Sequence, residues 1–182
     1  MRRIVPILWM LMLYPFLAIS NATAETAADI DADVDAALRN LYREAPSARA
    51  LSDKANAILV FPRIVKAGLL VGGQFGNGAL RKEGKPAGYY RTAAVSYGLQ
   101  AGAQTFGYAL FFMTADSTSY LNRSDGWEIG IGPSVVVVDE GMARTLSSTT
   151  LKDDIYAFIF GQKGLMAGLG VQGSKITRIN PD

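Results

Sequence analysis

Residues 57–80 read Ala-Ile-Leu-Val-Phe-Pro-Arg-Ile-Val-Lys-Ala-Gly-Leu-Leu-Val-Gly-Gly-Gln-Phe-Gly-Asn-Gly-Ala-Leu, and this stretch decides the fold. Its β-branched and large apolar residues indicate a strand, and it carries no catalytic side chain. Its glycines are Gly68, Gly72, Gly73, Gly76 and Gly78. Glycine inside a strand marks a bulge, a sharp bend or the close approach of another backbone. Because such glycines recur to the end of the chain, we predict a curved antiparallel sheet that wraps on itself.

The N-terminus has the pattern of a secretory signal peptide. A charged segment, Met1-Arg2-Arg3, precedes an apolar segment from Ile4 to Ile19, and the small residues Ala22-Thr23-Ala24 follow. This order predicts cleavage between Ala24 and Glu25, with residues 1–24 removed. We therefore expect a periplasmic or secreted protein that is peripheral to the membrane.

The alternative is that the apolar segment is kept as a membrane anchor. Pro6 and Pro15 interrupt it, and about 20 predominantly apolar residues are needed to span a bilayer. Cleavage is therefore the preferred interpretation. It would leave residues 25–182 as one domain, with a helical segment over 25–56 and a glycine-rich antiparallel β region over 57–182.

Charge gives no argument for nucleic acid binding. The chain has 18 basic and 16 acidic residues, and loss of Arg2 and Arg3 leaves 16 of each. The basic balance thus belongs to the precursor, and a nucleic acid partner is not expected.

The composition also excludes many classes of enzyme. The chain has no histidine and no cysteine, so the commonest general base and all thiol chemistry are excluded. No nucleophile with a neighbouring base is recognisable. The acidic pairs Asp139-Glu140 and Asp153-Asp154 do not have EF-hand spacing. We predict a protein that is not an enzyme and that needs no metal or other cofactor.

One motif resembles a nucleotide site. Residues 168–173, Gly-Leu-Gly-Val-Gln-Gly, match the pattern G-x-G-x-x-G. That fingerprint needs a following helix and an acidic residue about 20 positions on. Because the chain ends at Asp182, there is no room for either. We expect no nucleotide partner and interpret these glycines as strand packing.

The segment before residue 57 predicts two helices. Between Thr26 and Arg43 apolar residues recur at helical spacing, and Thr26 is the expected N-cap. Pro46 ends this helix, and Ser47 is expected to cap a second helix over 48–55. The apolar face is made of Ile30, Val34, Ala37, Leu38 and Leu41. Such an amphipathic helix either meets a membrane or packs on the sheet, and its acidic polar face favours packing.

The remaining chain predicts strands separated by turns. The expected strands are 57–80, 88–100, 101–113, 127–138 with an interruption at Pro133, 155–160, 165–171 and 174–179. Turns are expected at 81–86, 139–141, 161–164 and 172–173, and a helical turn capped by Asp116 over 117–122. The predicted fold class is α+β, with N-terminal amphipathic helices packed on a strongly curved, barrel-like antiparallel sheet of about seven or eight strands.

Two groups of residues are candidates for lipid contact. The basic group is Arg81, Lys82, Lys85 and Arg91, expected at the tip of a hairpin where it can meet lipid phosphates. The aromatic group is Phe106, Tyr108, Phe112 and Trp127, on strands with apolar residues on both faces. The alternative is a solvated turn for the first group and plain core for the second.

A series of short motifs, in order, resembles the SYLF domain family over roughly residues 38–179. The motifs are Phe61-Pro62, Lys66-Ala67-Gly68, Gly72-Gly73, Gly76-Asn77-Gly78, Gly88-Tyr89-Tyr90, Gly102-Ala103-Gln104, Phe112-Met113-Thr114, Lys163-Gly164-Leu165-Met166-Ala167-Gly168 and Gly173-Ser174. Eukaryotic members are lipid-binding modules that recognise phosphoinositides, and some yeast members bind actin. Bacterial members are exported single-domain proteins regarded as lipid binders.

The resemblance implies a lipid-binding domain without catalysis. Because an exported protein does not meet actin or phosphoinositides, actin is not an expected partner, and the expected ligands are anionic phospholipids or a membrane surface of the cell envelope. The alternative hypothesis is a structural or protein-interaction module of the envelope without lipid specificity. Strand order, the lipid species and the oligomeric state do not follow from the sequence.

Overall fold

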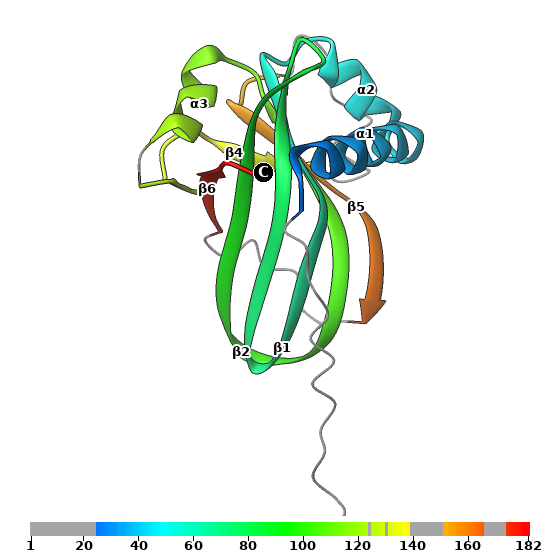
Figure 1. Cartoon of the computed structure of the whole chain (residues 1–182), viewed down its shortest axis with the longest axis vertical. Coiled ribbons are helices and arrows are strands. Elements are labelled where there is room, and N and C mark those ends of the chain that lie inside the picture. The colour runs from blue at the N-terminus through cyan, green and yellow to red at the C-terminus, as the bar shows by residue number, and fades with distance from the viewer. Residues whose placement is uncertain (1–24, 124, 130, 139–150, 166–173) are drawn as a thin grey trace, which may run out of the picture.

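The computed structural model describes residues 25–123, 125–129, 131–138, 151–165 and 174–182, and the chain is mostly β with some helix (Figure 1). Residues 1–24, including Ala24 of the predicted cleavage site, lie outside the described residues, as do the predicted turns at 139–141 and 172–173 and most of the predicted 165–171 strand. Among the helices of the described part, none is long and apolar enough to cross a membrane.

Helix α1, Ala27–Glu44, begins where the sequence predicts. The Thr26 hydroxyl accepts a hydrogen bond from the backbone N–H of Asp29 (3.2 Å), and the Asp29 carboxylate accepts one from the Thr26 N–H (3.2 Å). This reciprocal pair satisfies two free N–H groups of the first turn. Hydrogen bonding from the Thr26 side chain and backbone lowers the pKa of Asp29.

The two shorter helices begin differently from the prediction. Helix α2, Pro46–Ser52, has Pro46 in its first turn, where a missing N–H costs no hydrogen bond, and Ser47 does not cap it. Helix α3, Ala115–Ser119, is capped by Thr114 rather than by Asp116, and the short 3₁₀ helix η1, Tyr120–Asn122, follows it. The predicted caps Ser47 and Asp116 are therefore each wrong by two positions, since the N-caps are Ala45 and Thr114.

Strands β1, Ala57–Lys82, and β2, Lys85–Phe112, form one long antiparallel ribbon. The pairing runs from Ala57 opposite Phe112 to Lys82 opposite Lys85. Glu83 and Gly84 join the strands, and both have positive φ (52° and 76°), as a two-residue hairpin turn requires.

Glycines let this ribbon fold back on itself. A Cβ on Gly68 would lie 2.4 Å from Gly72 Cα, and one on Gly78 would lie 2.1 Å from the Val60 carbonyl oxygen. One on Gly76 would lie 2.8 Å from the carbonyl oxygen of Arg63. No side chain fits at these positions, so β1 bends near 68–72 and its second arm lies directly against its first. The prediction that these glycines mark a bend and close backbone approach is confirmed.

The sheet contains six strands in the described residues, in the order β3-β6-β2-β5-β4, with β1 on β2. The additional strands are β3, Trp127–Glu128, β4, Val135–Val137, β5, Ile155–Leu165, and β6, Lys175–Ile179. Since β1 and β2 each contribute two arms, the strand segments number eight, and the sheet curls into a half-barrel (Figure 1).

The sheet is mixed, which corrects the prediction of a purely antiparallel one: β4 pairs with β5 in parallel. The predicted strand 127–138 is broken between Glu128 and Val135, and its two pieces lie at opposite edges of the sheet. Gly132, with φ 98°, and Pro133, which cannot donate to a ladder, stand in the break.

The predicted turn at residues 161–164 is also wrong, because β5 continues through it. Gly161 and Gly164 have positive φ (59° and 97°), and the pairing with β2 shifts between Thr105 and Gly107. Gly161 therefore stands in a bulge of a continuous strand, whereas Gly164 keeps regular pairing with Gln104.

The sheet has two faces with separate cores. The inner face of the half-barrel packs Leu59, Ile64, Leu110 and Ile155 with other apolar residues. The outer face packs against the helices: Val60, Ala79, Phe111 and Phe158 form one cluster with the buried face of α1. That face of α1 consists of Ile30, Val34, Ala37 and Leu41. Figure 1 shows α1 and α2 at one end of the sheet, with the bend of the ribbon at the other.

Candidate functional site

Arg81, the first residue of the predicted basic tip, is buried under α1. Its guanidinium contacts the carboxylates of Asp31 (2.5 Å) and Asp35 (2.8 Å), and 6% of its side chain is exposed. Burial by itself lowers the pKa of Arg81, but the hydrogen bonds and charges of the two aspartates outweigh it, so the pKa is raised. The Tyr89 hydroxyl donates to Asp31 as well (2.8 Å), and this bond raises the pKa of Tyr89. Arg81 thus holds α1 on the ribbon and offers nothing to a ligand in solvent.

The other three basic candidates are exposed but do not gather at one place. Lys82 and Lys85 flank the hairpin turn. Arg91 pairs with Asn77, so it lies about 20 Å further along the ribbon. Its guanidinium is 5.1 Å from the centre of the Phe75 ring, and its Nε donates to the Asn77 side chain (3.1 Å).

The four aromatic candidates, Phe106, Tyr108, Phe112 and Trp127, all belong to the inner core. Of the four, Phe106 also lines a cavity, the one between α1, the β1–β2 ribbon and β5 that is described below. Trp127 lies 5.8 Å from Phe112 between ring centres, and its indole N–H donates to the carbonyl of Ile131 (3.0 Å). The Tyr108 hydroxyl has no hydrogen-bond partner within the part of the chain that the structure describes, and burial raises its pKa.

Four apolar side chains that are not among the residues predicted from the sequence are exposed on the outer face, toward the bend of the ribbon. We call Val65, Val71, Phe75 and Val95 the outer patch; their exposed fractions are 46, 54, 47 and 63%. Val95 pairs with Gly73, which separates Val71 from Phe75, so these three side chains share one face as neighbours. Adjacent exposed residues are small, namely Ala67, Gly73, Ala93 and Ala103, which leaves the surface smooth.

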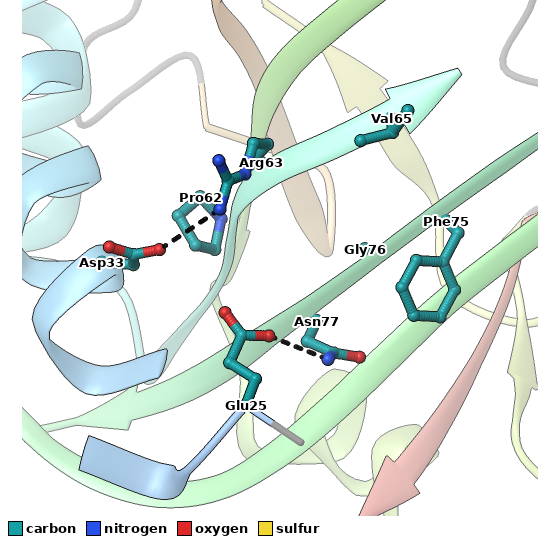
Figure 2. A pocket seen from close by; sticks show the side chains of 8 residues that line it. All are labelled: Glu25, Asp33, Pro62, Arg63, Val65, Phe75, Gly76 and Asn77. Atoms are coloured by element: carbon teal, nitrogen blue, oxygen red, sulfur yellow. Dashed lines mark hydrogen bonds and ion pairs between the residues drawn. The ribbon is translucent and has the colours of Figure 1, made fainter. Parts of the chain in front are cut away.

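A cavity of about 150 Å³ lies between the two arms of β1 at this patch (Figure 2). Val65 lies on one arm and Phe75 on the other, with Gly76 between them. The polar rim is of mixed charge. Asp33 faces Arg63 at 4.0 Å, and the Asn77 amide donates to Glu25 (2.9 Å), the residue directly after the predicted cleavage site.

A second cavity, of about 210 Å³, lies between α1, the β1–β2 ribbon and β5. We call it the cationic pocket. Arg63 and Lys163 line it, together with the Thr105 hydroxyl and an apolar floor that includes Phe160 and Gly107. No carboxylate is among its lining residues. Because Arg63 also lines the cavity at the outer patch, the two hollows are neighbours.

A third cavity, of about 420 Å³, lies beside α2 and the hairpin turn. Its charges oppose one another: Asp35, Asp53 and Glu83 face Arg49 and Arg81. Among the described residues, no three side chains of the metal-ligating types converge on one point.

In comparisons with known proteins, no protein-family model matches this chain, and no curated protein matches it. The resemblance to the SYLF family therefore stays a prediction.

Proposed function

We propose that this protein is a non-catalytic module that binds phospholipid at a membrane surface of the cell envelope. The observation that carries the proposal is the outer patch: four exposed apolar side chains, with the exposed cations Arg63, Arg91 and Lys163 beside them. The sequence adds two supports, the resemblance to lipid-binding domains and the predicted export signal.

The energetics of this surface suit reversible membrane contact. Complete burial of a Val or Phe side chain contributes about 1.5–3 kcal/mol. Since the patch residues are half exposed, insertion among lipid chains is worth about 1 kcal/mol for each. A cation near an anionic leaflet adds about 1 kcal/mol. The free energies of several such contacts add, but their sum stays far below that of a spanning helix, whose insertion is effectively irreversible.

Vesicle sedimentation tests the proposal. The protein is purified after export, in the N-terminal form that the host leaves, and mass spectrometry determines whether Glu25 is its first residue. It is then sedimented with phosphatidylglycerol vesicles and with phosphatidylcholine vesicles, at low and high salt. We expect binding to the anionic vesicles that weakens with salt.

A matched pair of variants locates the contact. Val71→Ser with Val95→Ser removes two side chains of the outer patch, whereas Ile131→Ser with Val137→Ser removes two of similar type and exposure elsewhere (57 and 40% exposed). We expect the first double variant to lose at least tenfold in affinity and the second to bind as the unchanged protein does. Failure of the unchanged protein to bind any vesicle would overturn the proposal in favour of a protein-interaction module. Equal loss in both variants would overturn the assignment of the patch.

A further inference from the structure

We infer that the cationic pocket is the site that takes the phosphate of an anionic phospholipid headgroup. This inference rests on the proposed function and adds to it a ligand chemistry, a place and an orientation of the lipid. It concerns residues outside the basic hairpin that the sequence singles out.

The charges of the three cavities differ. The cationic pocket is lined by two cations and no carboxylate, whereas the cavity at the outer patch has Glu25 and Asp33 beside Arg63. The third cavity carries charges of both signs. Of these three, only the cationic pocket is complementary to an anion, and a guanidinium with an ammonium suits a phosphate group.

The carboxylates near the pocket are engaged elsewhere. Asp33 lies 4.0 Å from Arg63 on the side of the neighbouring cavity, and both groups are about half exposed or more, so this ion pair is weak. Glu44 accepts hydrogen bonds from the Asn40 amide (2.8 Å) and from the backbone N–H of Gly161 (3.2 Å). Its two oxygens therefore help to fix the wall between α1 and β5, and none of the ion pairs among the described residues joins a carboxylate to Lys163.

The register of the sheet connects the pocket to the outer patch. Thr105 on β2 pairs with Val65 on β1 and with Lys163 on β5, so these three side chains form one row on the outer face. Neighbours in such a row are about 5 Å apart. A phosphate held by Lys163 and Arg63 would thus stand beside Val65, and the acyl chains of the same lipid would extend over the outer patch.

Gly107 gives this pocket its apolar floor. A Cβ there would lie 2.4 Å from the ring of Phe160, so the ring can occupy this place only because residue 107 is glycine. The result is a polar mouth over an apolar floor, which suits the junction between a headgroup and its chains.

The test removes the same charge at two places. Arg63→Gln with Lys163→Gln removes two cations from the pocket, and Lys82→Gln with Lys85→Gln removes two exposed cations from the hairpin turn. Each cation at an anionic surface is worth about 1 kcal/mol, or about fivefold in affinity. We expect the pocket variant to lose about twentyfold in affinity for phosphatidylglycerol vesicles and the turn variant to lose less than threefold. Arg63→Lys with Lys163→Arg, which keeps both charges, is expected to restore most of the binding.

The outcomes separate this inference from the proposed function. If the unchanged protein binds anionic vesicles and the pocket variant binds them equally well, the inference is overturned and the proposed function stands. If the unchanged protein binds no vesicles, both are overturned. Thermal unfolding of each variant shows that a loss of binding does not reflect a loss of folded protein.

A further arm distinguishes the lipid from a free phosphate ester. Glycerol 3-phosphate and inorganic phosphate are added to the vesicle assay at millimolar concentration. We expect neither to displace the protein from vesicles, because neither contacts the outer patch. Displacement by either one would assign the pocket to a soluble phosphate compound and would overturn the lipid as its ligand.

Discussion

The outer face of the β1–β2 ribbon has a covered region and a bare region, both on the same strands. In the covered region Val60, Ala79 and Phe111 are fully buried beneath the helices. In the bare region, the outer patch, Val71 and Phe75 are about half exposed. The residue types are alike, so the difference comes from what lies over the sheet.

The proposed lipid contact rests on this difference. In the covered region the apolar residues are satisfied by α1 and stabilise the fold. In the bare region similar residues stay about half exposed, and exposed apolar residues that cluster mark an interaction surface. Three comparisons of paired substitutions test this distinction.

The largest effect is expected where the ribbon folds on itself. In Gly78→Ala the new Cβ would lie 2.1 Å from the Val60 carbonyl oxygen, so the backbone of one arm must move. We expect destabilisation above about 5 kcal/mol, or no folded protein. At Gly73 a Cβ finds only ordinary contact, 3.8 Å from the Ala94 carbonyl oxygen. Gly73→Ala is therefore expected to change the free energy of unfolding by no more than about 0.5 kcal/mol. Urea unfolding measures both, and equal stability of the two variants would contradict the close approach of the arms.

The next effect compares one residue type in the two regions. Phe111→Ala leaves a cavity beneath the helices, where Phe111 also meets Phe158 edge to face at 5.2 Å between ring centres. We expect a loss of about 3–5 kcal/mol in the free energy of unfolding. Phe75→Ala is expected to lower the free energy of unfolding by less than about 1 kcal/mol, since the side chain is half exposed, and to weaken vesicle binding. A Phe75 variant as unstable as the Phe111 variant would show that the patch belongs to the core.

The smallest effect concerns the ion pairs that hold α1 over the covered region. Arg81→Ala removes hydrogen bonds to Asp31 and Asp35, and because both carboxylates keep contact with water, we expect a loss of about 2–3 kcal/mol. Lys82→Ala, one residue further along, is expected to stay within about 0.5 kcal/mol. If the Arg81 variant also kept full stability, the ion pairs would not be what fixes the helix. Chemical denaturation with matched protein concentrations provides the measurement.

Several features of the fold follow from short-range signals. Thr26 caps α1 because its hydroxyl and the Asp29 carboxylate are three residues apart, a spacing that the sequence displays. The glycines of 57–80 predicted a bend and close approach, because only their missing side chains permit it. Pro133 predicted the interruption between β3 and β4 for an equally local reason.

The candidate site depended on information of longer range. Alternation along a strand separates its two faces, but it does not say which face lies inside the half-barrel. Phe106 and Phe112 were therefore candidates for lipid contact although both are core residues, while Phe75 was not a candidate although half of it is exposed. The apolar residues between the glycines are visible in the sequence. Whether they are exposed depends on how much of the sheet α1 and α2 cover, which the sequence does not show.

By itself the sequence determined the elements: where α1 begins, that 57–112 forms a glycine-rich ribbon, and that the chain has neither histidine nor cysteine for catalysis. Only the tertiary structure decided that Arg81 pairs with α1, that Pro133 separates strands at opposite edges, and that Arg63 and Lys163, 100 residues apart, line one pocket. The reason is physical. Caps, turns and close glycine contacts are set by neighbours along the chain, whereas burial and the meeting of charges depend on which distant segment covers each face.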